Sequence, residues 1–530
     1  MRTSERVHCS RFPVESATLT SPTDVARWTT ATNAAPRIVF LICVLAVAAR
    51  LIFINQPYVD HWSWRQSDVA AIARNFLQNG FRFGYPQIDW AGNAPGYVGT
   101  EFPILPFIAA ACYRLAGVHE WIGRIQAVIL FAVSLPFFFL LVRKIFGRTA
   151  AVWATFFFCF TPLNVFAGRS FMPDVPSLSL AIVGLYFFLR WVEHGESTSF
   201  FVAAIAISLS LLIKITSIVI VVPLVYLAVA EGGDLGSGER SDAKGSRGER
   251  PRLQVILFAA IAILPSAIWY WHAHEIAQKF YPHHFFGAGG IRIEAFSWYW
   301  HIAQQTLVSS LTPLLSLMAL IGLLVAPRSK FSRLFHWWLV AMVFFVMVLG
   351  YGNRHLWYQL PFVPIAAAFA GAACAFLGSK ISSRAIAVTL SILLVSSFTP
   401  LAFWYVQPLY QSSAAQLLDA GLELKKTTPP DALIVAADMG DPTIFYYAER
   451  QGWHFLENDA TYNGNPDDSE QAIENLERLR RRGATHFVFT RNTFWWTQSY
   501  PEFVGDLSKH ATLIEATPEF RIYKLITVAR

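Results

Sequence analysis

Carboxylates, cations and aromatic side chains gather in short polar segments that interrupt long apolar runs. A carboxylate suits the removal of a proton from a hydroxyl group or the binding of sugar hydroxyls. A cation suits a phosphate group, whose developing charge it stabilises when the phosphate leaves. We therefore take the following residues as site candidates: Asp60, Arg65, Asp68, Glu101, Arg169, Asp174, Lys214, Arg354, His355 and Tyr358.

Simpler interpretations exist for each segment. Residues 58–76 could be an aromatic interface belt followed by an amphipathic surface helix. Glu101, which precedes an apolar helix, could be a solvated acid that the helix dipole stabilises. Arg169 and Asp174 could pair with each other, and Lys214 could extend to the membrane interface. We keep the functional interpretation as an alternative, because ionisable groups at the edge of a membrane span are costly and are therefore functional candidates.

The apolar runs identify a polytopic α-helical membrane protein. Of the 530 residues, 54% are hydrophobic and only 15% are charged, whereas a soluble domain carries about a quarter charged residues. Runs of about 18 apolar residues can cross a hydrocarbon core roughly 30 Å thick. We predict about eleven transmembrane helices, near residues 37–55, 121–142, 149–167, 175–192, 199–213, 215–230, 253–272, 302–327, 334–350, 358–378 and 385–406.

Basic residues in the short connections set the expected orientation. With the N-terminus inside, the positive-inside rule is obeyed by every basic connection: Arg143 to Arg148, Arg190, residues 231–252, Arg328 to Arg333, and Lys380 to Arg384. Counting 102–115 as a span would invert all of them, so we predict an interfacial helix there. The large first loop, 56–120, and everything after residue 406 then lie on the outer, periplasmic side.

Three regions follow from this division of the chain. Residues 1–36 are polar, and we expect them to be disordered and cytoplasmic, ahead of the transmembrane domain at 37–406. Residues 407–530 predict a soluble periplasmic α/β domain. Its expected strands are 432–437, 485–490, 512–516 and 520–526, and its expected helices are 417–426 and 470–482.

Neither the cysteines nor the charge indicates a cofactor or a nucleic-acid partner. The five cysteines form no CxxC motif, which argues against a disulfide framework or a zinc site. We assign no metal ligands and expect no obligatory cofactor, with a divalent metal left open. The net charge of +7 lies mostly in short loops, where it is a topology signal, so we predict a membrane partner and no nucleic acid.

At the polar segments the sequence resembles the membrane glycosyltransferases of the C superfamily, in particular family 39 and the aminoarabinose-transferase type. The resemblance covers about residues 37–375. It is carried by residues 64–76 (WRQSDVAAIARNF), 101–106 (EFPILP), Gly123-Arg124, 169–174 (RSFMPD), the Leu-Leu-Ile-Lys junction that ends at Lys214, and 355–361 (HLWYQLP).

The resemblance implies a function and roles for several residues. Such enzymes transfer a sugar from a polyprenyl-phosphate donor at the periplasmic side of the bacterial inner membrane, to a lipid, glycan or protein acceptor. An aspartate of the first loop is their base, and here Asp60 and Asp68 compete, with Asp60 favoured for its closeness to the first span. The resemblance gives Asp174 the assisting role and places Lys214 near the lipid phosphate, and Arg354 could serve similarly.

Two rival functions remain at this point. A transporter or flippase of lipid-linked glycans would place charged or Gly/Pro-broken residues mid-span and show repeated halves, and the chain shows neither. An O-antigen ligase or polymerase would share the lipid-linked donor but place its key loop late in the chain. The richest loop here is the first one, which favours the transferase.

Overall fold

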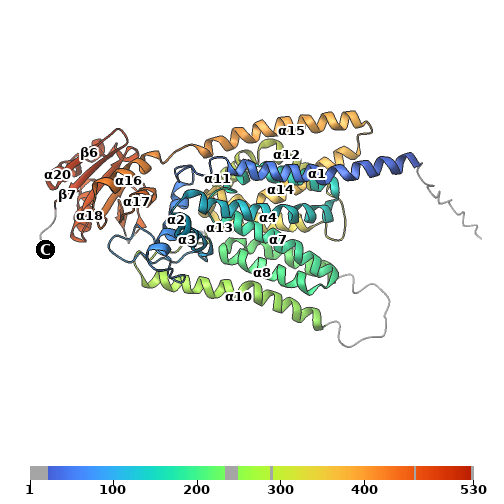
Figure 1. Cartoon of the computed structure of the whole chain (residues 1–530), viewed down its shortest axis with the longest axis horizontal. Coiled ribbons are helices and arrows are strands. Elements are labelled where there is room, and N and C mark those ends of the chain that lie inside the picture. Colours follow the sequence, from blue (N-terminus) through green and yellow to red (C-terminus); the bar gives the residue numbers. More distant parts are fainter. Residues whose placement is uncertain (1–21, 233–248, 287–289, 459–460, 527–530) are drawn as a thin grey trace, which may run out of the picture.

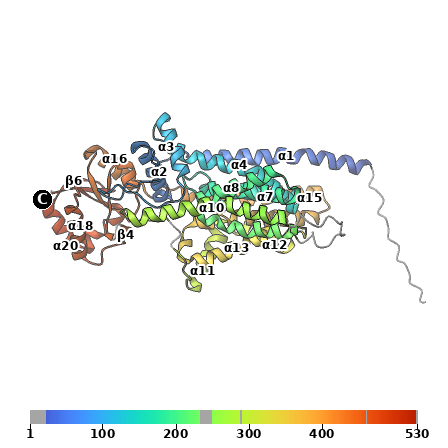
Figure 2. The same cartoon turned by 90° about the horizontal axis from the view of Figure 1, so that it is seen from below.

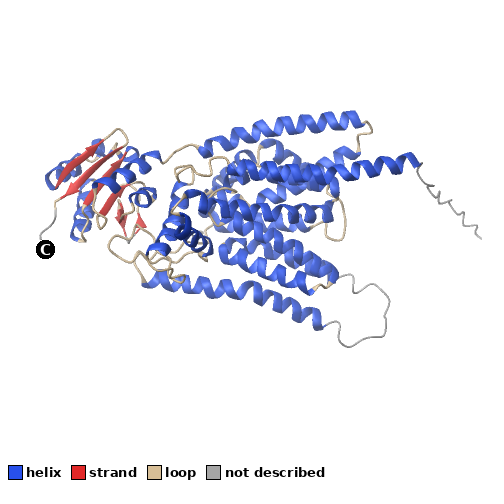
Figure 3. Ribbon diagram, in the orientation of Figure 1, coloured by secondary structure: helices blue, strands red, loops and turns tan. Residues whose placement is uncertain are grey.

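The computed structural model describes residues 22–232, 249–286, 290–458 and 461–526. Long helices run side by side through most of the chain, and a small sheet with its own helices stands at one end of them (Figures 1 and 3). The N-terminal half contributes α1 (Pro22–Leu51), α2 (Ser63–Gln78), α3 (Ile104–Ala116), α4 (Glu120–Phe146), α5 (Arg148–Phe160), α6 (Pro162–Ala167), α7 (Asp174–His194), α8 (Ser197–Ile213), η1 (Ile215–Ile220) and α9 (Val221–Gly232). The bundle continues with α10 (Glu249–Lys279), α11 (Phe296–Gln304), η3 (Gln305–Ser310), α12 (Pro313–Val325), α13 (Leu334–Leu349), η4 (Gly350–Arg354), η5 (Leu356–Gln359), α14 (Phe362–Ser379), α15 (Arg384–Val406) and η6 (Gln407–Tyr410).

Every predicted span coincides with helix, but fewer helices have the length and composition of a complete membrane span. Within the described residues, six helices are long and apolar enough to cross a membrane, or seven if one bent pair counts as a single span. The pair is 296–310 with 313–325, bent by 106°. The predicted count of eleven is therefore not confirmed.

Helix breaks and short helices explain part of the difference. The predicted span 149–167 divides into α5 and α6 at Thr161, which has extended backbone angles before Pro162. Lys214 likewise has extended angles (φ −155°, ψ 111°) and separates the 17-residue α8 from η1. Helix α1 begins at Pro22, so the segment 1–36, expected to be disordered, is helical from there onward, and residues 1–21 lie outside the described part.

The first loop folds into a compact layer at the end of the bundle. It contains α2, which is buried along most of its length, and α3, a 13-residue apolar helix that is too short to span a membrane. Figure 1 shows both helices between the long helices and the C-terminal sheet. The prediction of 102–115 as a helix that does not cross the membrane agrees with these lengths.

The C-terminal domain is a mixed α/β unit. Its elements are α16 (Ala415–Thr427), β1 (Leu433–Ala437), α17 (Thr443–Ala448), β2 (Gln451–His454), β3 (Glu457–Asn458), β4 (Thr461–Tyr462), α18 (Ser469–Arg481), β5 (His486–Thr490), η7 (Arg491–Thr493), α19 (Trp496–Ser499), α20 (Pro501–His510), β6 (Ala511–Ala516) and β7 (Phe520–Leu525). The strand order is β2-β1-β5-β7-β6, with β1 parallel to β2 and β5 and with antiparallel pairing beyond β5. All four predicted strands are present.

The C-terminal domain and the first loop are in direct contact. The backbone N–H of Ala414 donates a hydrogen bond to the carbonyl oxygen of Val59 (3.0 Å). The N–H of Gly452 in β2 donates to the carbonyl oxygen of Asp89 in the first loop (3.0 Å), and the N–H of Gly92 donates to the carbonyl oxygen of Gly452 (2.6 Å). Helix α10 also reaches the domain with its C-terminal end (Figures 1 and 2), where the Tyr281 hydroxyl donates to Glu457 at 3.1 Å. The first loop and the domain therefore lie at the same end of the bundle.

Candidate active site

A cavity of about 350 Å³ lies where the bundle, the first loop and the C-terminal domain meet. Most of the predicted site residues line it, although they come from elements far apart in the sequence. They are Arg65 and Asp68 of α2, Glu101 of the first loop, Lys214 of the α8–η1 break, and Arg354, His355 and Tyr358 of the connection between α13 and α14. Other lining residues include Trp64, Trp90, His284, Phe286, Trp357, Gly440, Pro442, His454 and Tyr462.

Asp68 is the carboxylate best placed to accept a proton. It lies one helical turn after Arg65, so both side chains share the cavity face of α2. The Trp90 indole donates to Asp68 Oδ1 at 3.0 Å, and Oδ2 has no hydrogen-bond partner among the described residues. Burial raises the pKa of Asp68 to about 7, against the hydrogen bond from Trp90 and the charge of Arg65. A base with this pKa can take up a proton near neutral pH.

Arg65 and Glu101 form an ion pair in the wall of the cavity. Arg65 Nη2 lies 2.5 Å from Glu101 Oε1, and the Thr100 hydroxyl donates to Glu101 Oε2 at 3.0 Å. Burial opposes the charge on Glu101, but Arg65 and Lys214 outweigh it and lower its pKa. The Arg65 guanidinium also lies 4.7 Å from the centre of the Phe286 ring, and its Nη1 is buried without a hydrogen-bond partner in the described residues. Arg65 therefore keeps donor capacity for a ligand.

Lys214, which lines the cavity, pairs with Asp174 of α7. Lys214 Nζ lies 2.9 Å from Asp174 Oδ1 and 5.0 Å from the centre of the Tyr358 ring. The helix break at Lys214 turns the chain at the point where the ammonium group meets the cavity. Asp174, the first residue of α7, does not line the cavity itself. The predicted alternative, a pair between Arg169 and Asp174, is wrong, because each has another partner.

The connection between α13 and α14 supplies a cation and an aromatic wall. Arg354 is exposed, and its guanidinium lies 4.1 Å from the centre of the Tyr351 ring. The His355 ring stacks on Trp357, with centroids 4.3 Å apart and an interplanar angle of 6°. Burial and the neighbouring Arg354 lower the pKa of His355 to about 3. His355 is therefore a neutral stacking surface at physiological pH.

Asp60 and Arg169 lie outside the cavity in a buried ion-pair cluster with Arg124. Asp60 Oδ2 lies 3.0 Å from Arg169 Nη2 and 3.4 Å from Arg124 Nη2, and all three side chains are 0% exposed. Asp60 Oδ1 accepts from the backbone of Trp62 (3.1 Å) and from the side chain of Gln66 (2.8 Å). With its oxygens occupied in this way, Asp60 anchors the start of α2, and Asp68 has the better access to a ligand.

The C-terminal domain contributes His454, which the sequence did not single out. Asp438 follows β1 and His454 ends β2, so the carboxyl ends of two adjacent parallel strands bring them together. His454 Nδ1 lies 2.9 and 2.8 Å from the two Asp438 oxygens, and the Gly440 backbone donates to Asp438 Oδ1 at 3.0 Å. Burial opposes the charged imidazole, but Asp438 outweighs it and raises the pKa of His454.

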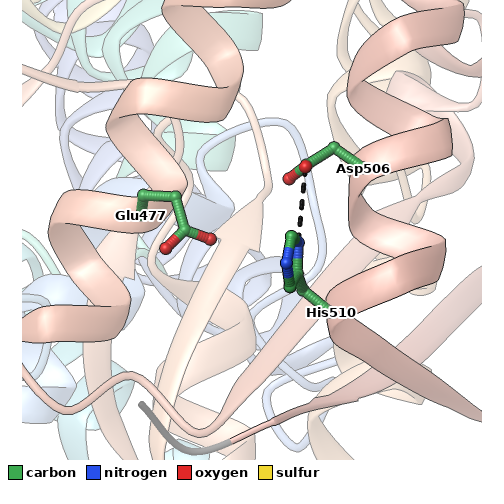
Figure 4. Close-up of side chains that lie close together, drawn as sticks. All are labelled: Glu477, Asp506 and His510. Carbon is green, nitrogen blue, oxygen red and sulfur yellow. Dashed lines mark ion pairs between the residues drawn. The ribbon is translucent and has the colours of Figure 1, made fainter.

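A cluster of three ionisable residues in this domain lies away from the cavity. Glu477 of α18 and Asp506 and His510 of α20 face one another (Figure 4), with ligand-type atoms within 4.8 Å. Glu477 is also paired with Arg480, and His510 Nδ1 lies 3.3 Å from Asp506 Oδ1. These contacts satisfy the group as a surface ion-pair network, and we assign no metal to it.

Part of the chain matches a known protein family, and the whole fold is similar to solved structures. Residues 100–269 match the family described as dolichyl-phosphate-mannose-protein mannosyltransferase. ArnT from Cupriavidus metallidurans, solved with bound undecaprenyl phosphate, aligns with a TM-score of 0.59 and 14% identity over 92% of this chain and 97% of its own. The predicted resemblance to the C superfamily is confirmed. No curated protein sequence gives a significant match.

Two further solved structures share the fold. The archaeal oligosaccharyltransferase AglB from Archaeoglobus fulgidus, solved with an inhibitory peptide and a dolichol-phosphate, aligns with a TM-score of 0.55 and 13% identity over 91% of this chain and 73% of its own. The arabinofuranosyltransferase AftD from Mycobacteria aligns with a TM-score of 0.52 and 13% identity over 92% of this chain and 41% of its own.

Several cavity residues were not among the predicted site residues, including Trp90, His284 and His454. The sequence carries an indirect signal for the first two, because Trp90 lies in the aromatic first loop and His284 in a loop assigned to the same face. Desolvation and the nearby Arg65 lower the pKa of the half-buried His284 to about 4. His454 carries no sequence signal, because its place depends on the docking of a separate domain.

Proposed function

We propose that this protein transfers a sugar from a polyprenyl-phosphate donor to an acceptor hydroxyl, in the cavity, at the outer face of a bacterial inner membrane. The observation that carries the proposal is the joint presence of an available carboxylate, Asp68, and of cations that suit a phosphate. The lipid phosphates bound in the structures of ArnT and AglB support a donor of this class. The acceptor is a lipid, a glycan or a protein, and the sugar is a hexose or a pentose.

The reaction is a displacement at the anomeric carbon. Asp68 Oδ2 removes the proton from the acceptor hydroxyl, and the hydroxyl oxygen attacks the carbon. The bond from that carbon to the phosphate oxygen breaks, and its electron pair leaves with the polyprenyl phosphate. Lys214 and Arg354 stabilise the charge that develops on the phosphate.

Other cavity residues position the reactants. Arg65, fixed by Glu101, holds its free N–H groups for a hydroxyl or phosphate oxygen. The stacked rings of His355 and Trp357 offer a face on which a sugar ring packs. Asp174 acts through Lys214, because its carboxylate holds the ammonium group at the cavity wall. The same electrostatic task is one that a divalent metal performs in other enzymes, and we propose that these cations perform it here.

Transfer assays test the proposal directly. Membranes containing the full-length protein are supplied with radiolabelled polyprenyl-phosphate hexoses and pentoses, and label in lipid, glycan and protein fractions is counted. We expect Asp68→Asn to lower the rate about 10²- to 10⁴-fold, the usual contribution of a general base. Asp431→Asn, an exposed aspartate of the C-terminal domain, is the matched control and should retain wild-type activity. Full activity of Asp68→Asn, or no transfer from any donor by wild type, would contradict the proposal.

A further inference from the structure

Two acid–base groups from separate domains face the same cavity. Asp68 belongs to α2 of the first loop, and His454 belongs to β2 of the C-terminal domain. Trp90 lies between them: its indole N–H bonds Asp68 at 3.0 Å, and its ring centroid lies 5.2 Å from that of His454. The histidine is thus a near neighbour of the proposed base.

The loop that carries Asp438 also fixes the C-terminal domain to α2. Asp441 Oδ2 accepts from the Ser63 hydroxyl at 2.6 Å, and the hydroxyls of Ser67 and Thr443 lie 2.9 Å apart. Ser63 and Ser67 are one turn apart on α2, which also carries the base. These contacts therefore fix the position of the His454–Asp438 pair relative to Asp68.

A buried carboxylate on Nδ1 has two consequences for His454. It stabilises the imidazolium form, since an opposite charge at hydrogen-bond distance favours the charged state. It also occupies Nδ1, which leaves Nε2 as the ring atom with no partner among the described residues. His454 can therefore present a positive charge to the cavity without being neutralised from the cavity side.

We infer that His454 is a positioning residue of the proposed transferase: held as a cation by Asp438, it favours the ionised form of the Asp68 carboxylate, so the base is more active while the C-terminal domain is docked. This inference rests on the proposed function and deepens it. The C-terminal domain then completes the active site electrostatically. Its role follows from charge, because a cation in a partly dehydrated cavity acts on a nearby carboxylate more strongly than in water.

The other charged groups around this carboxylate have mixed effects. Arg65 on the same helix also favours the ionised carboxylate, although it is paired with Glu101 at 2.5 Å. Asp441 is negative and opposes ionisation. His284, with its lowered pKa of about 4, is neutral at physiological pH. Lys214 is paired with Asp174 at 2.9 Å. His454 is thus the cationic neighbour contributed by the C-terminal domain.

Infrared titration measures the charge of Asp68 without relying on catalysis. The full-length protein in lipid nanodiscs is titrated, and the carboxylic-acid band that disappears in Asp68→Asn is assigned to Asp68. In His454→Gln we expect the midpoint of this band to rise by about one pH unit, the size typical for loss of a nearby opposite charge. Asp438→Asn, which keeps the ring but weakens its charge, should shift the midpoint in the same direction by less.

The matched control is His486→Gln. His486 is a buried histidine of β5 in the same sheet, and it does not line the cavity. We expect its variant to leave the Asp68 midpoint unchanged. A midpoint in His454→Gln equal to that of wild type, or an equal shift in His486→Gln, would overturn the inference.

The pH profile of sugar transfer gives the functional readout. In His454→Gln the acidic limb of kcat/KM should move up by about one unit, so the rate falls about tenfold on that limb and approaches wild type at alkaline pH. An equal loss at every pH would overturn the inference, because it would mark a purely structural role. If wild type transfers no sugar, the proposed function fails, while the infrared titration still decides the inference.

Discussion

Replacing Asp60 by asparagine removes the only carboxylate from a buried cluster that holds two arginines. In the native protein Asp60 accepts charged hydrogen bonds from Arg169 at 3.0 Å and from Arg124 at 3.4 Å, and it is fully buried. Asparagine keeps the shape but loses the charge, and it presents a donor where the carboxylate only accepted. Two guanidinium groups are then left close together without a counter-charge.

The expected cost is large, because breaking a buried ion pair by removal of one partner destabilises a protein by about 3–5 kcal/mol. Asp68→Asn should behave in the opposite way. Burial already disfavours the ionised form of Asp68, as its raised pKa shows, so a neutral side chain there should leave stability unchanged or slightly higher. The two aspartates thus separate a structural role from a catalytic one.

Thermal unfolding and sugar transfer, measured on the same purified samples, distinguish these roles. We expect Asp60→Asn to lower Tm by several degrees while the folded fraction still transfers sugar. Asp68→Asn should keep Tm and lose transfer. If Asp60→Asn is as stable as wild type and inactive, then Asp60 is the base, as its closeness to the first span suggested, and the reasoning from the buried cluster is refuted.

Other perturbations test the remaining parts of the site. Lys214→Met should lower transfer about 10²-fold or more by removing a phosphate-binding cation, and it should lower Tm because Asp174 loses its partner. Adding Asp174→Asn should restore Tm but not transfer, and restored transfer would exclude the phosphate role. Wild-type transfer should rise with pH through about 7, because Asp68 must lose its proton to act as base; a rate independent of pH in that range would argue against this base. EDTA should leave transfer unchanged if the side-chain cations suffice, and a loss that Mg²⁺ or Mn²⁺ reverses would show a metal requirement. Gly92→Ala should loosen the docking of the C-terminal domain, because the residue has φ +58° and a Cβ would lie 1.9 Å from the Trp453 ring; faster proteolysis of the 406–415 connection, compared with Gly505→Ala, measures this.

The sequence by itself determined the local features of this protein. Apolar runs located the helices, because burial in lipid acts on each segment separately, and the short basic connections predict an orientation. Short apolar runs located β1 and β5, and the segments on either side of Pro518 located β6 and β7. Charged residues beside spans identified the ionisable groups that the bundle and the first loop contribute to the cavity, except His284, since such groups are costly unless they have a task.

Only the tertiary structure decided which of these charged residues meet. Asp60 and Asp68 are eight residues apart and chemically alike, yet one is enclosed by Arg124 of α4 and Arg169 of the α6–α7 connection while the other opens to the cavity. The helix breaks that divide the predicted spans depend on packing as well as composition. His454 joins the site because two parallel strands end side by side and the domain docks on α2. Pairing and docking are set by contacts between segments far apart in the chain, and no local pattern records them.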